Sequence, residues 1–173
     1  HDVLFDRSVP FGEDHIFNLH YCRHANRIVV CKNLVYRYRL GGLASSVKYY
    51  PDKCRLSLAL LEAYCEFCGG RDNVPDAFWK KAVRDGFVGS VTHYLVHCKM
   101  NEAAQKTRES LAFYAPYLNE DTVNVDNYSS KLARYVLKAD VKQILRQIYR
   151  EQFASIAKKK MKKLYYKFFT KRI

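Results

Sequence analysis

Residues 51–70, PDKCRLSLALLEAYCEFCGG, have the sequence pattern of one complete helix. Proline suits the first turn of a helix, and Pro51 stands just before apolar residues that recur with helical spacing. Gly69-Gly70 ends the segment, because glycine readily adopts the left-handed backbone that terminates a helix. We therefore expect a helix over about 52–68.

The helical period continues through the rest of the chain. Pro75-Asp76 opens the next expected helix, in which the interior glycines Gly86 and Gly89 suit close packing against a neighbour. The polar segment 119–130 reads as a connection. The expected helices cover 76–100, 102–115 (ended by Pro116), 129–138 and 140–169, with a break near Asp140. The sequence thus predicts an all-helical module from residue 48 onward.

The first 47 residues have a different pattern. A short helix is expected from Glu13 to His24, with acidic residues in its first turn. Residues 27–32 and 35–40 read as two short β-rich runs, and 41–46 as a loop. The predicted fold is therefore mainly α, with a helical module (48–173) preceded by a small α/β remnant (1–47).

Composition restricts the class of protein. Hydrophobic residues make up 49% of the 173 residues, which is enough for the chain to fold. No run of 18 apolar residues occurs, so no membrane span is expected. The N-terminus lacks the apolar core of a signal peptide and begins mid-pattern, so we expect an upstream part to precede it. We also expect a cytoplasmic location, in which the six cysteines stay reduced and pack as small hydrophobic residues.

Two ordered motifs lie within residues 4–47. Together they resemble the second half of the family-two glycosyltransferases, which have the GT-A fold. The first motif comprises Phe5, Gly12, Glu13, Asp14, Ile16, Phe17, Asn18, Leu19 and Tyr21. The second follows after about ten residues and comprises Val35, Tyr36, Tyr38, Arg39 and Ser45 or Ser46.

The resemblance implies a role for each motif. In that family the acidic motif lies at the acceptor site and its Asp is the general base, which here is Asp14. Glu13 is expected to shape the site or to contact acceptor hydroxyls. The second motif implies a segment beside the donor diphosphate, where Arg37 or Arg39 offsets leaving-group charge. The expected substrate-binding residues are Arg37, Tyr38, Arg39, Ser45 and Ser46.

A structural interpretation competes with the catalytic one. Glu13 and Asp14 suit the positive N-terminal end of a helix dipole whatever their chemistry. Arg37 and Arg39 also suit an edge strand, where charged side chains discourage pairing with other chains. The order and spacing of the two motifs favour the glycosyltransferase interpretation.

The resemblance also implies a divalent metal, Mg²⁺ or Mn²⁺, held by an Asp-x-Asp motif in the donor-binding half of the domain. No Asp-x-Asp occurs in the 173 residues. We therefore expect the metal ligands and most of the donor pocket to lie upstream of His1. This piece alone is then expected to be inactive.

The positive charge of the chain is concentrated near its C-terminus. The formal net charge is +13, and residues 121–173 hold 14 Lys and Arg against 4 acids. The last residues form an amphipathic pattern that suits an anionic membrane surface, consistent with lipid-linked or envelope glycan synthesis at the cytoplasmic face. The expected membrane-contact residues are Lys158, Lys159, Lys162, Lys163, Tyr165, Lys167 and Phe168.

Two alternatives stay open, and two others are not favoured. The tail also suits a solvated helix that packs on the module, and the whole chain suits a non-catalytic interaction or membrane-docking module. Nucleic-acid binding uses similar residues, but no recognisable motif accompanies the charge, so no nucleic-acid partner is expected. Cys65 and Cys68 with His93 and His97 have the residue types of a zinc site, but their separation is too long for a compact finger, and no metal site is predicted.

Overall fold

The computed structural model describes residues 3–7, 9–10, 12–29, 32, 48–123 and 130–151. This part of the chain is mainly helical, as predicted. By its contacts the chain divides into two compact units, His1–Phe87 (unit 1) and Val88–Ile173 (unit 2). The predicted boundary near residue 47 concerns a larger domain and stays a prediction.

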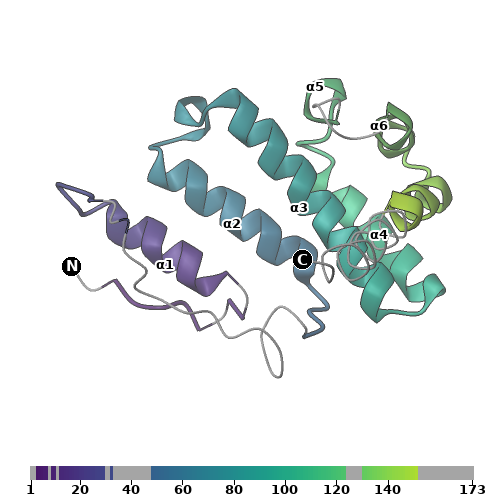
Figure 1. Cartoon of the computed structure of the whole chain (residues 1–173), viewed down its shortest axis with the longest axis horizontal. Coiled ribbons are helices and arrows are strands. Elements are labelled where there is room, and N and C mark those ends of the chain that lie inside the picture. The colour runs from purple at the N-terminus through teal and green to yellow at the C-terminus, as the bar shows by residue number, and fades with distance from the viewer. Residues whose placement is uncertain are drawn as a thin grey trace, which may run out of the picture. The chain divides into compact units, whose positions relative to one another are not determined.

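Unit 1 is built around the packing of α1 (Glu13–Cys22) on α2 (Lys53–Phe67), which lie side by side in Figure 1. A short 3₁₀ helix, η2 (Arg71–Asn73), follows, and then the first part of α3 (Asp76–His97). Ile16 is the buried residue of α1. The other buried apolar residues of this unit are Tyr50, Cys54, Leu61, Ala63, Val74, Val83 and Phe87.

The end of α2 matches the prediction and has a clear local cause. Gly69 and Gly70 have φ angles of 76° and 131°. The Gly70 N–H donates to the Cys65 carbonyl (2.8 Å), and the Gly69 N–H donates to the Glu66 carbonyl (3.1 Å). This is the Schellman pattern, which satisfies the last carbonyls of a helix and reverses the chain direction.

Arg71 fixes the turn that leads into α3. Its guanidinium pairs with the Asp76 carboxylate (3.0 Å) and lies 4.6 Å from the centre of the Trp79 ring. Asp76 also pairs with Lys80 one turn later (2.7 Å). The turn between α2 and α3 is thus held by a small charged cluster at the helix start.

Unit 2 contains the second part of α3, then α4 (Met100–Tyr114), α5 (Glu120–Val123), α6 (Ser130–Leu137) and the helical residues 141–151. Its largest fully buried side chains are aromatic and aliphatic, with three small polar residues among them. These are Tyr94, Tyr114, Ile144, Ile148, Val91, Thr107, Ser90 and Ser110. Thr107 and Ser110 donate to carbonyls one turn earlier, which satisfies their hydroxyls inside the core.

The sequence analysis missed α5, which lies in the segment read as a connection. Asn119 and Thr122 form a reciprocal cap: the Asn119 side chain accepts from the Thr122 N–H (3.0 Å), and the Thr122 hydroxyl accepts from the Asn119 N–H (2.9 Å). The expected break near Asp140 is confirmed. Ala139 has a φ of 50°, and the Asp140 carboxylate accepts from the Gln143 N–H at the start of the next helix.

The expected strand at 27–32 is wrong over its described part, because residues 27–29 and 32 are not in a strand. Ile28 and Val29 are exposed, at 61% and 68%. None of the described residues forms a strand with which this run could pair, and an isolated strand is not stable. Residues 35–40 lie outside the described residues, and the α/β remnant stays a prediction.

Candidate functional site

The predicted acidic pair lies in the first turn of α1. Gly12 precedes the helix with a φ of 81°, in the left-handed region, and the chain then enters the helix at Glu13. Glu13 is half-buried and Asp14 is exposed. One oxygen of Asp14, Oδ1, accepts from the His15 backbone N–H (2.8 Å). Asp14 therefore stands at a helix N-terminus with its carboxylate open to solvent.

An aromatic stack ties the preceding segment to α1. The rings of Phe5 and Phe17 are parallel, with their centres 4.2 Å apart, and Tyr21 continues the row at 6.1 Å from Phe17. Phe5, Phe17 and Tyr21 all belong to the first predicted motif. The conspicuous aromatic residues of that motif thus fix the chain that leads to the acidic turn.

The other predicted site residues lie outside the described residues. They are Arg37, Tyr38, Arg39, Ser45 and Ser46 at the expected donor side, and Lys158, Lys159, Lys162, Lys163, Tyr165, Lys167 and Phe168 in the tail. A cleft shared by Asp14 and the arginine-bearing segment therefore stays a prediction.

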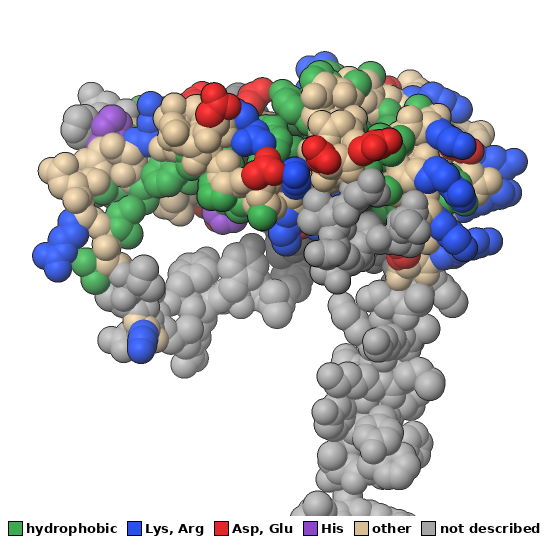
Figure 2. All heavy atoms as spheres, turned by 90° about the horizontal axis from the view of Figure 1, so that it is seen from above, with side chains coloured by type: hydrophobic (Ala, Val, Ile, Leu, Met, Phe, Trp, Pro, Cys, Tyr) green, Lys and Arg blue, Asp and Glu red, His purple; other side chains and the backbone are tan. Residues whose placement is uncertain are grey.

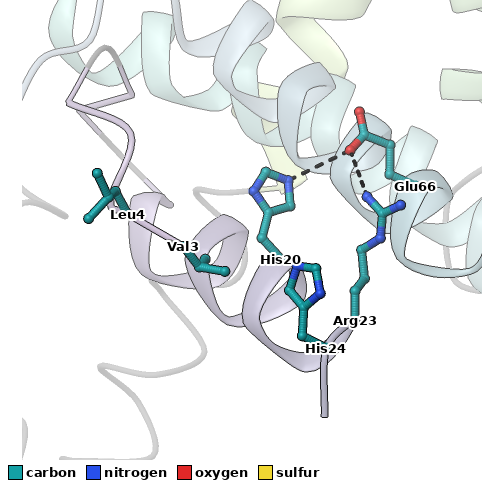
Figure 3. A pocket seen from close by; sticks show the side chains of 6 residues that line it. All are labelled: Val3, Leu4, His20, Arg23, His24 and Glu66. Atoms are coloured by element: carbon teal, nitrogen blue, oxygen red, sulfur yellow. Dashed lines mark hydrogen bonds and ion pairs between the residues drawn. The ribbon is translucent and has the colours of Figure 1, made fainter. Parts of the chain in front are cut away.

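A cavity of about 380 Å³ lies at the other end of α1, and the sequence analysis did not predict it. Its polar residues are His20, Arg23 and His24 from α1 and its end, and Glu66 from α2 (Figure 3). Glu66 Oε2 lies 3.4 Å from Arg23 Nη1 and 3.7 Å from His20 Nε2. These exposed pairs join α1 to α2 and add only tenths of a kcal/mol each, up to about 1 kcal/mol. Asp14 does not line this cavity.

A larger groove of about 720 Å³ lies in unit 2, between α4 and the helical residues 141–151. Four cations line it: Arg108, Lys142, Arg146 and Arg150. The other described residues that line it are Met100, Asn101, Ala104, Val141, Leu145 and Tyr149, and none of these is acidic. Figure 2 shows Lys and Arg side chains gathered at the right of the view, over the part of unit 2 that Figure 1 colours green and yellow.

The spacing of these cations was visible in the sequence. Lys142, Arg146 and Arg150 are four residues apart, so a helix places them in one row. Arg108 comes from α4 and joins the row only through the fold. The sequence analysis assigned the positive charge to the C-terminal third as a whole and did not single out this row.

Four titratable groups outside both cavities have clearly shifted pKa values: Lys53, Cys65, Asp76 and Asp85. Burial lowers the pKa of Lys53, the first residue of α2, to about 8. Burial also raises the pKa of the Cys65 thiol, which keeps that thiol protonated.

The remaining predictions about metal and membrane concern groups that the fold could gather. Among the described residues no three His, Cys, Asp or Glu side chains are close enough together to hold a metal ion. The described cysteines form no disulfide, and of them only Cys54 is buried. None of the described helices has both the length and the apolar character needed to span a bilayer.

Comparison with family models, with curated proteins and with solved structures found no match to this chain.

Proposed function

We propose that this chain is the C-terminal part of an inverting, nucleotide-sugar-dependent glycosyltransferase, and that Asp14 is its general base. The observation that carries the proposal is the position of Asp14 in the first turn of α1, directly after a left-handed glycine and open to solvent. Among the described residues no Lys, Arg or His side chain pairs with this carboxylate. It is thus available to accept a proton from an incoming hydroxyl.

The chemistry required of Asp14 is a single proton transfer. The acceptor hydroxyl oxygen forms a bond to the anomeric carbon of the donor sugar, and the bond from that carbon to the nucleotide diphosphate breaks. The hydroxyl proton moves to the Asp14 carboxylate as the new bond forms. The positive end of the α1 dipole favours the ionised carboxylate that this role needs before the reaction.

The other predicted residues have supporting roles in this proposal. Glu13 contacts acceptor hydroxyls beside Asp14, and Arg37 or Arg39 stabilises the charge that develops on the departing diphosphate. Tyr38, Ser45 and Ser46 line the same donor side. We place these residues by the motif resemblance alone.

The divalent metal implied by the resemblance does not fit the residues present. The 173 residues contain no Asp-x-Asp motif, and the described residues contain no cluster of three metal ligands. We propose that upstream residues of the parent enzyme hold the Mg²⁺ or Mn²⁺ ion and most of the donor. We assign no step in this chain to the metal.

The test is a set of variants in the parent enzyme. Asp14→Asn keeps the shape of the side chain but removes its basicity, so we expect transfer to fall about 10²- to 10⁴-fold. Donor affinity, measured by calorimetry, should stay unchanged. Asp72→Asn is the matched control, because Asp72 is also an exposed aspartate and lies in η2. Near-normal turnover in Asp14→Asn would show that the base is elsewhere.

The groove of unit 2 favours a second, non-catalytic role for this chain, which is docking to a membrane. A row of exposed cations beside apolar side chains suits docking to an anionic surface. We propose that the parent enzyme is peripheral at the cytoplasmic face of a membrane, with the C-terminal tail as one contact.

A further inference from the structure

We infer that the groove between α4 and the helical residues 141–151 binds the headgroup phosphates of anionic phospholipids. The inference concerns a site that the tail prediction did not include, and it does not depend on the glycosyltransferase proposal. It rests on three properties of the groove: its unpaired cations, its apolar lining and the charge of the chain that follows it.

The cations of the groove have no counterion within the part of the chain that the structure describes. Lys142, Arg146 and Arg150 are exposed, as is Arg108 on the opposite wall. Among the described residues none of the four forms an ion pair, whereas Lys80, Lys81, Arg84 and Lys106 elsewhere each pair with an acid. Like charges four residues apart repel one another on a helix. A bound polyanion relieves that repulsion, so the groove is suited to phosphate.

The apolar lining distinguishes a lipid from a free anion. Met100 and Tyr149 are both 59% exposed at the groove, although both are largely apolar. Val141, Ala104 and Leu145 line it as well. A phospholipid presents a phosphate next to glycerol and acyl carbon, which matches cations beside an apolar surface. Tyrosine is also common at the headgroup level of membranes, where one end of its ring is wet and the other apolar.

The positive charge of the C-terminal tail argues against the tail as the occupant of the groove. Residues 152–173 contain eight Lys and Arg and no acid, so they are repelled by the groove. The same charge attracts both the tail and the groove toward an anionic bilayer, with about 1 kcal/mol for each basic residue near the surface.

A nucleic acid fits the groove less well than a lipid does. The row from Lys142 to Arg150 is about 12 Å long, given a rise of about 1.5 Å per helical residue. Binding of a single strand needs a longer basic track with several aromatic platforms on which bases stack. Among the residues that the structure describes, Tyr149 is the only aromatic one that lines the groove.

The experiment is sedimentation of the full chain with vesicles of phosphatidylcholine, with and without phosphatidylglycerol. The test variant is Lys142→Gln with Arg146→Gln, in the groove. The control is Lys131→Gln with Lys138→Gln, which removes the same charge from exposed lysines of unit 2 that do not line the groove. Both variants keep the tail, so its contribution cancels.

We expect binding to require phosphatidylglycerol and the groove variant to bind at least about tenfold more weakly than the control. An equal loss in both variants would overturn the proposal, because it would show a response to net charge alone. Failure of the full chain to sediment with anionic vesicles would overturn it as well.

A footprint on the unaltered chain keeps the test independent of the variants. Anionic vesicles should slow acetylation of Lys142 several-fold while leaving that of Lys131 unchanged. Inorganic phosphate and a single-stranded RNA serve as the competing probes. Protection of Lys142 by either of these but not by the vesicles would assign the groove to a different ligand and reject the lipid.

Discussion

Lys53 shows at the scale of one residue how burial changes chemistry. It is the first residue of α2 and half-buried, and burial lowers its pKa from 10.5 to about 8. In the unfolded chain the amine keeps its ordinary pKa, so between pH 8 and 10.5 the unfolded state binds more protons. Lys53 therefore lowers the free energy of unfolding below pH 8, and this destabilisation decreases as the pH rises from 8 to 10.5.

We predict that Lys53 is the more reactive amine when compared with an ordinary exposed lysine. At pH 8 about half of the Lys53 side chains are neutral, and the neutral amine is the form that reacts. Acetylation with limiting reagent, followed by mass spectrometry, should modify Lys53 first. Equal rates at Lys53 and Lys138 would contradict the shifted pKa.

Asp76 has the opposite effect on stability, because its surroundings favour its charged form. Hydrogen bonds from Lys80 and then Arg71 lower the pKa of its carboxyl below 3.8. As the pH falls, Asp76 therefore takes up a proton in the unfolded chain before it does so in the folded chain. The stability that Asp76 contributes is lost as the pH falls below about 3.8. Well above pH 3.8 the contribution of Asp76 to folding stability is fully present.

We predict that Asp76→Asn lowers the thermal unfolding temperature at pH 7. The difference from the unaltered chain should disappear at low pH, where Asp76 is protonated. Asp72→Asn is the control, because Asp72 is exposed and forms no ion pair among the described residues. A difference for Asp76→Asn that persisted unchanged at low pH would rule out the ion pairs as its cause.

The glycines in and after the helices differ in whether the structure requires a glycine. The prediction that Gly89 suits close packing is wrong, because a Cβ built there meets no atom within 4 Å and the residue is exposed. Gly69 is different, since its φ of 76° is one that other residues adopt only with strain.

We predict opposite effects of alanine at these two positions. Gly89→Ala should stabilise the chain by about 0.5–1 kcal/mol, because alanine has the higher helix propensity and finds free space. Gly69→Ala should destabilise it by about 1 kcal/mol or more. Urea unfolding monitored by circular dichroism measures both, and a loss of stability in Gly89→Ala would mean that the glycine has an unrecognised packing role.

At the scale of elements, local signals predicted the long helices well. Pro51 and Gly69-Gly70 bound α2 within one or two residues, because both residue types act through their own backbone. The short α5 was missed, since its reciprocal cap by Asn119 and Thr122 lies in a polar segment with no apolar period. The β-rich run at 27–32 failed over its described residues because strands depend on neighbours that propensity does not supply.

At the scale of the whole molecule, the candidate sites differ in how far the sequence predicts them. The place of Asp14 in the first turn of a helix follows from nearby residues and matches the structure. In the groove, α4 places Arg108 opposite the row that begins at Lys142, and no local sequence pattern predicts that placement. The cavity at Glu66 likewise joins two helices separated by a long stretch of chain.

Azide rescue in the parent enzyme tests whether Asp14 removes the proton of the acceptor hydroxyl. Azide attacks an anomeric carbon without losing a proton, so it does not need a base. We expect Asp14→Ala to lose transfer to the hydroxyl acceptor and, with azide present, to convert the donor into a glycosyl azide of inverted configuration. Near-normal transfer to the hydroxyl acceptor in Asp14→Ala would contradict the claim.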